Sequence, residues 1–135
     1  MKYNGIIESK LRIIEQKLAE IESWNIVSFS QLCESSLLQN AVERALQVCT
    51  EVMIDISERI LALNEIPPLP SSSENMAKLQ EMKILPARPE YGDMVKVRNF
   101  IVHRYEKIDL EIIYGILKNK LFLFNAFIEE IRRQS

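Results

Sequence analysis

The amino-acid sequence predicts an all-α fold, an up-and-down bundle of about five helices. Apolar residues recur at alternating steps of three and four along most of the chain, which is the spacing of one face of an α-helix. Only three glycines occur in 135 residues, so β-hairpin turns have little to form from. A chain of this length suits one core, and we expect residues 1–135 to form a single domain.

The first half of the chain predicts two long helices. Residues 3–24 form the first, on whose single stripe lie Ile7, Leu11, Ile14, Leu18 and Ile21. Ser28 and Ser30 are candidate N-caps for the second helix, which we expect to end near Leu63. The stripe of that helix comprises Val42, Leu46, Cys49, Met53, Ile56, Ile60 and Leu63. Such stripes can build either one shared core or the seam of a dimer, and both interpretations stay open at this point.

The second half predicts three shorter helices. The proline- and serine-rich segment 67–73 ends the long helix and forms a loop, because proline cannot continue a helix. We expect a short helix over about residues 74–84 and another over about residues 90–105. Asp109 is a candidate N-cap for the last helix. The apolar residues of that helix are Ile112, Ile116, Leu123, Phe127 and Ile131.

Charge and cysteine content exclude several classes of protein. With 17 basic and 19 acidic side chains, the formal net charge is −2, which argues against bulk electrostatic binding of nucleic acid but allows a small basic cleft. Cys33 and Cys49 form no CxxC pair, and one histidine is too few to complete a zinc site, so we expect neither a metal nor a cofactor. No apolar run approaches the roughly 18 residues of a membrane span. The expected location is a reducing cytoplasm with both thiols free.

The side chains best suited to chemistry gather in residues 98–105, RNFIVHRY, which include the only histidine of the chain. At about 100° per residue, Arg98, Asn99, His103 and Tyr105 fall within one arc about 160° wide on a helix. An apolar border lies beside this arc and is formed by Met94, Val97 and Ile101. Polar groups at the margin of a core need partners, which the protein itself, a second copy or a ligand can supply.

These residue types fit metal-free cleavage of RNA. The planar, permanently charged guanidinium of Arg98 suits a phosphate, and the imidazole of His103 suits proton transfer near neutral pH. The alternative is structural, because lone histidines are usually satisfied within the fold and an Arg-Asn-His trio is often a hydrogen-bonded rim. A second group of carboxylates, on the long second helix, has no Glu-x-x-His pattern and is more typical of a solvated face. Its members are Glu43, Glu51, Asp55 and Glu58.

At this point the sequence resembles a known family. RNFIVHRY followed by EKID resembles the Arg-x4-His-x-Tyr signature of HepT-like toxins of the HEPN superfamily. Residues 37–52, LLQNAVERALQVCTEV, are similar to the second-helix pattern of that family, and the expected order of helices agrees. The resemblance spans most of the chain. The motif is moderately specific alone and more specific in this helical context.

The resemblance implies a HEPN-like helical bundle that forms a homodimer and acts as a metal-independent endoribonuclease. Arg98 and His103 would be catalytic at a cleft in the dimer interface, and Asn99 would support them. Tyr105 would be the residue to which a minimal nucleotidyltransferase (MNT) antitoxin adds AMP. The alternative is a non-catalytic subunit that binds a nucleotide or serves as partner of such a transferase. Both functions use the same face of the same helix, so the sequence does not separate them.

Overall fold

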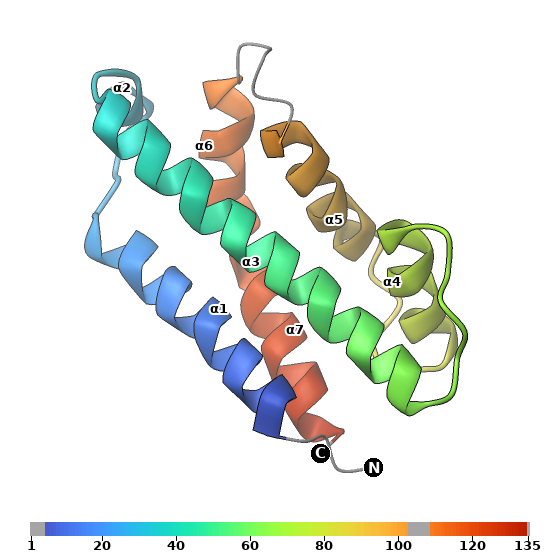
Figure 1. The fold of residues 1–135 in the computed structure, drawn as a ribbon. Helices are drawn as coiled ribbons and strands as arrows, with labels where there is room; N and C mark the ends of the chain where they lie inside the picture. Colours follow the sequence, from blue (N-terminus) through green and yellow to red (C-terminus); the bar gives the residue numbers. More distant parts are fainter. Residues whose placement is uncertain (1–4, 103–108, 135) are drawn as a thin grey trace.

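The computed structural model describes residues 5–102 and 109–134, and for Asn99, Phe100 and Val102 it describes the backbone alone. Within these ranges the chain forms seven α-helices and no strand, which confirms the all-α class but not the count of about five (Figure 1). The helices are α1 (Gly5–Ser23), α2 (Phe29–Cys33), α3 (Ser36–Leu63), α4 (Ser72–Glu81), α5 (Pro89–Val102), α6 (Leu110–Asn119) and α7 (Phe122–Arg133).

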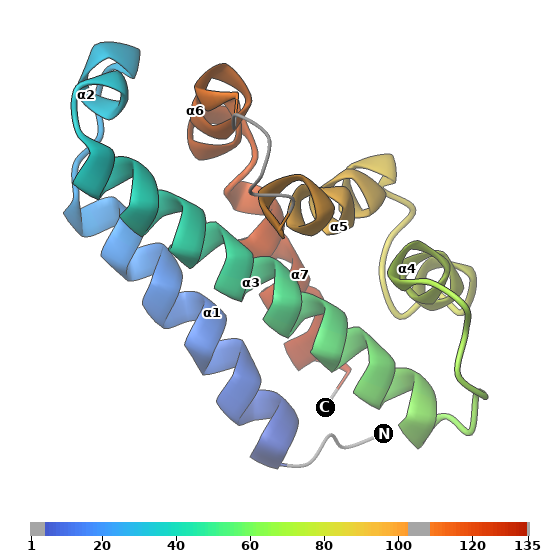
Figure 2. The same ribbon diagram turned by 45° about the horizontal axis from the view of Figure 1, so that its top comes forward.

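Helix α3 is the central element of the bundle. It packs against α1 along one side and against α5 and α4 along the other, while α7 lies behind it (Figures 1 and 2). The predicted stripe of α1 is buried at Ile7, Leu11, Ile14 and Ile21. The stripe of α3 is buried except for its last member, Leu63, which is 45% exposed. Both stripes therefore belong to one intramolecular core and not to the seam of a dimer.

The predicted second helix is wrong at its start, because the segment forms two helices. The Ser28 hydroxyl accepts a hydrogen bond from the Gln31 backbone N–H and caps the five-residue helix α2. Ser30, the other candidate cap, lies inside α2. The Ser35 hydroxyl then accepts from the Leu38 N–H and begins α3. The apolar pattern continues through this break, so periodicity alone does not reveal it.

The predicted last helix is also divided. Its expected N-cap is confirmed, since the Asp109 carboxylate accepts a hydrogen bond from the Glu111 N–H. The chain then bends around Leu121 into α7, so that α6 packs against α2 while α7 packs against α1. Ile112, expected in the core, is 47% exposed, and its neighbour Ile113 is buried instead.

Two groups of ion pairs hold α1 to the rest of the bundle. Arg132 of α7 donates hydrogen bonds to the carboxylates of Glu8 and Glu15 on α1, at distances from 2.7 to 3.2 Å. Lys10 of α1 pairs with Asp55 of α3 at 2.6 Å. In the described part of the chain, no helix is both long and apolar enough to cross a membrane.

Candidate functional site

Helix α5 carries the first residues of the predicted motif. It begins at Pro89, a residue favoured in the first turn because its missing N–H would have no partner there. Met94 and Ile101, two members of the predicted apolar border, are buried, and Val97 is half-buried against the same core. The border is thus confirmed, and it holds α5 in one rotational position. That position leaves Arg98 half-buried at the edge of the core.

Arg98 lines a cavity of about 200 Å³ between α3, α4 and α5. The other walls are Ile54 of α3, Val95 of α5 and the serines Ser71–Ser73 at the start of α4. No hydrogen bond or ion pair holds the Arg98 guanidinium within the described residues. A half-buried cation that has no partner among the described residues and shares a cavity with three serines is suited to the oxygens of a phosphate.

The serines beside Arg98 were expected in a loop, and the structure makes them the start of a helix instead. The Ser71 hydroxyl accepts a hydrogen bond from the Glu74 N–H at 3.1 Å, so Ser71 is the N-cap and Ser72 and Ser73 form the first turn of α4. The Ser-x-x-Glu spacing of Ser71 and Glu74 is the sequence signal that could have revealed this start. Their proximity to Arg98 had no signal in the sequence.

The other predicted site residues are less fully described. Asn99 follows Arg98 on α5, and only its backbone is described. His103 and Tyr105 lie outside the described residues. The structure therefore brings Arg98 together with α4, while the arrangement of Arg98, His103 and Tyr105 stays a prediction.

The carboxylates of the long helix do not form a common site. Asp55 is engaged by Lys10 and by Arg59, whose Nε lies 3.2 Å from its carboxylate. Burial tends to raise the pKa of Asp55, but the hydrogen bonds from Lys10 and Arg59 outweigh it and lower the pKa below its usual value. Across residues 5–102 and 109–134, no group of three or more metal-ligating side chains comes together. Asp55 therefore ties α1 to α3.

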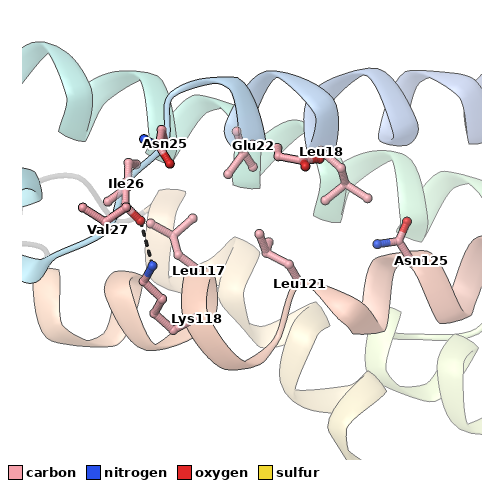
Figure 3. Close-up of a pocket in the computed structure, with 10 residues that line it drawn as sticks. Leu18, Glu22, Asn25, Ile26, Val27, Leu117, Lys118, Leu121 and Asn125 are labelled. Atoms are coloured by element: carbon pink, nitrogen blue, oxygen red, sulfur yellow. Dashed lines mark hydrogen bonds between the residues drawn. The ribbon is translucent and has the colours of Figure 1, made fainter.

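A larger cavity, of about 370 Å³, opens between the end of α1 and the α6–α7 bend (Figure 3). Its one described basic residue, Lys118, points across the cavity and donates a hydrogen bond to the Ile26 carbonyl at 2.7 Å. The same ammonium lies 5.4 Å from the centre of the Tyr114 ring. Because this cation already has partners, the cavity is less suited to a phosphate than the one at Arg98.

Comparison with known proteins gives consistent matches over nearly the whole chain. A family model described as "Ribonuclease HepT-like" matches residues 14–131. The mRNA nuclease HepT of Shewanella oneidensis is 28% identical over 97% of this chain and 99% of its own length. The tRNA nuclease HepT of Aphanizomenon flos-aquae is 26% identical over 93% of this chain and 87% of its own. A solved structure of a tri-AMPylated Shewanella oneidensis HEPN toxin in complex with an MNT antitoxin is similar, with a TM-score of 0.88, 27% identity and coverage of 97% and 99% of the two chains.

Proposed function

Because the chain belongs to the HepT-like ribonuclease family, we propose that it is a metal-independent endoribonuclease that cleaves RNA through Arg98 and His103. We further propose that it is the toxin of a HEPN/MNT toxin–antitoxin pair, acting in the cytoplasm as one domain over residues 1–135. The observation that carries the catalytic proposal is the Arg98 guanidinium, half-buried in a cavity and without a partner among the described residues. The two relatives named as nucleases support the reaction class.

The proposed chemistry divides two tasks between two side chains. The RNA 2′-hydroxyl attacks the adjacent phosphorus, the bond to the 5′-oxygen breaks, and a cyclic phosphate end remains. His103 assists proton transfer, either from the attacking hydroxyl or to the leaving oxygen. Arg98 donates hydrogen bonds to the phosphate oxygens as negative charge develops there. Asn99, next to Arg98 on α5, supports the pair with its amide.

Cleavage assays on purified protein test this mechanism. Arg98→Ala and His103→Ala should each lower the rate by orders of magnitude, about 10²-fold or more, since positioned charge and proton transfer are both lost. Lys96→Ala is the matched control, because Lys96 is an exposed cation on the same helix. The cleavage rate of this variant should change little. Cleavage that EDTA abolishes, or that persists in His103→Ala, would contradict the mechanism. A wild-type protein that binds RNA without cutting it would support the binding-subunit function instead.

We propose that the active form is a homodimer and that its partner is an MNT-type nucleotidyltransferase that adds AMP to Tyr105. The similar toxin solved in AMPylated form with an MNT antitoxin supports this partner. The added phosphate and base would bring negative charge and bulk close to Arg98, which lies seven residues earlier in the chain, and would repel an RNA backbone.

Co-expression with the transferase tests the role of Tyr105. Intact mass spectrometry should detect AMP on the wild-type protein and none on Tyr105→Phe. Because Tyr105→Phe removes only the acceptor hydroxyl, the variant should keep its ribonuclease activity while escaping neutralisation. AMP added equally to both proteins would contradict the assignment.

A further inference from the structure

A third cavity, of about 300 Å³, is lined by α3 and α4, the same two helices that help to line the Arg98 cavity. We propose that it holds an adenine base of the RNA substrate, with the Asn75 amide reading the edge of the base. This inference rests on the proposed ribonuclease function and assigns a base subsite next to the proposed phosphate position at Arg98.

The Asn75 side chain is the polar group that faces this cavity. Asn75 is only 5% exposed. Its backbone N–H bonds to the Ser71 carbonyl, but its side-chain amide has no hydrogen-bond partner in the described ranges. The Asn75 amide is therefore neither bonded within the described residues nor sealed from solvent, and on the wall of the cavity it is open to a ligand that supplies a donor and an acceptor.

Apart from Glu58, the remaining walls are apolar, and the end of α3 holds them in place. The Ile66 N–H donates to the Leu61 carbonyl at 2.9 Å, and the Glu65 N–H donates to the Ala62 carbonyl at 3.0 Å, which closes the helix in a Schellman turn. Pro67 and Pro68 follow, and their rings fix the backbone. Aliphatic and proline surfaces that are already in place can cover the faces of a flat ring.

The charge of the cavity favours a base over a phosphate. None of the described residues that line it is basic, and Glu58 lies exposed at its edge. A phosphate would be repelled by this carboxylate and would find no described cation to offset its charge, whereas an uncharged base can pack against the apolar walls and pair with the Asn75 amide. An asparagine amide pairs with adenine through two hydrogen bonds, to N6 and N7.

The two cavities lie close enough to serve neighbouring parts of one substrate strand. Ile54 lines the Arg98 cavity and Glu58 lines the Asn75 cavity, and four residues along α3 correspond to about 6 Å. On α4, Ser71–Ser73 face the first cavity and Asn75 the second. A phosphate held by Arg98 therefore leaves an attached or adjacent base within reach of Asn75, as in proteins that bind unstacked bases of single-stranded RNA.

Binding of short 2′-O-methyl oligomers of A, C and U, measured by fluorescence anisotropy, tests the subsite without cleavage. Wild-type protein should bind the A oligomer on the order of tenfold more tightly than the C or U oligomer, and Asn75→Leu should lose this preference. Asn75→Leu keeps the side-chain size and removes an unpartnered amide, so the fold should persist, as circular dichroism will check. Asn125→Leu is the matched control, because its amide lines the cavity of Figure 3, and it should keep the preference.

Equal binding of the three oligomers by wild type, no binding of any, or an unchanged preference in Asn75→Leu would overturn the inference. If the protein cleaves RNA but shows one of these results, the base subsite is refuted and the proposed function is supported. If the protein prefers the A oligomer but does not cleave RNA, the base subsite is supported and the proposed ribonuclease function is refuted. If Asn75→Leu leaves RNA binding unchanged and weakens only the complex with the transferase, the cavity belongs to a protein interface and the inference falls.

Discussion

Tyr91 offers a direct test of how α5 is held in the bundle. Its side chain is 0% exposed, and its ring packs edge-to-face against Phe127 of α7 with 6.3 Å between centroids. Its hydroxyl is the one buried side-chain polar atom without a hydrogen-bond partner in the described structure. Burial raises the pKa of Tyr91 to about 12, so the group stays neutral at physiological pH. Tyr91→Phe removes the hydroxyl and keeps the ring contact.

We expect Tyr91→Phe to be more stable than the wild type. A buried polar group without a partner costs about 1–3 kcal/mol, and the lower end applies because the vacated space is only one oxygen in size. A gain of about 1 kcal/mol corresponds to a rise in Tm of about 4 °C for a domain of this size. Thermal unfolding followed by circular dichroism gives Tm, and urea unfolding gives the free energy of unfolding.

Tyr114→Phe is the matched control. The Tyr114 hydroxyl donates a hydrogen bond to the Val27 carbonyl at 3.4 Å, and the ring packs edge-to-face against Phe29. Removing that hydroxyl should therefore leave stability unchanged or lower it slightly. If Tyr91→Phe lowered stability by 1 kcal/mol or more, the hydroxyl would have a favourable partner in solution and the reasoning would be refuted.

Two further perturbations test the helix contacts and the helix ends. Arg132 lowers the pKa of Glu8 and of Glu15, chiefly through hydrogen bonds, so the stability it provides is present above the ordinary carboxyl pKa of 4.5 and is lost as pH falls through the lowered values. Arg132→Leu should therefore lower the free energy of unfolding at pH 7. Between pH 7 and pH 3, the free energy of unfolding should decrease less in Arg132→Leu than in the wild type. An identical pH dependence of the two proteins would contradict this. Lys83 ends α4 at a φ of 63°, so Lys83→Gly should raise the free energy of unfolding by about 1 kcal/mol. Lys96→Gly, in the interior of α5, should lower the free energy of unfolding by about the same amount in the same urea titration. If both glycine variants raised or both lowered the free energy of unfolding, the role of the φ of Lys83 would be contradicted.

The sequence was sufficient to predict the class of fold and most of the core. The apolar stripe of α1 and that of α3 can be read from spacing alone, because a helix repeats its faces every three to four residues whatever it packs against. The Asp109 cap could be predicted for a similar reason, since a side-chain oxygen at a helix start interacts with the backbone of the next turn. Local interactions of this kind require no knowledge of the rest of the chain.

The end of α3 at Leu63 was predicted from the prolines that follow it, but boundaries without such a signal were not predictable in this way. Helix α4 ends at Glu81, before the expected end near residue 84, and Lys83 follows it in the left-handed region with a φ of 63°, at a position where glycine is the usual signal. The breaks before Ser36 and around Leu121 likewise interrupt no apolar pattern. At these points the chain turns because the following helix packs elsewhere in the core, which is a property of the whole bundle.

The candidate site also has features that the sequence predicted and features that only the tertiary structure revealed. The sequence by itself singled out Arg98, Asn99, His103 and Tyr105, because their spacing places them on one helix face and their side chains suit phosphate binding and proton transfer. Only the tertiary structure brought Arg98 to the serines of α4 and turned the Asn75 amide toward a cavity. Residues 71–75 and Arg98 are far apart in the chain and meet because α4 and α5 both pack against α3. Helical periodicity specifies which face of a helix is buried, whereas the contacts between faces depend on how the helices pack together.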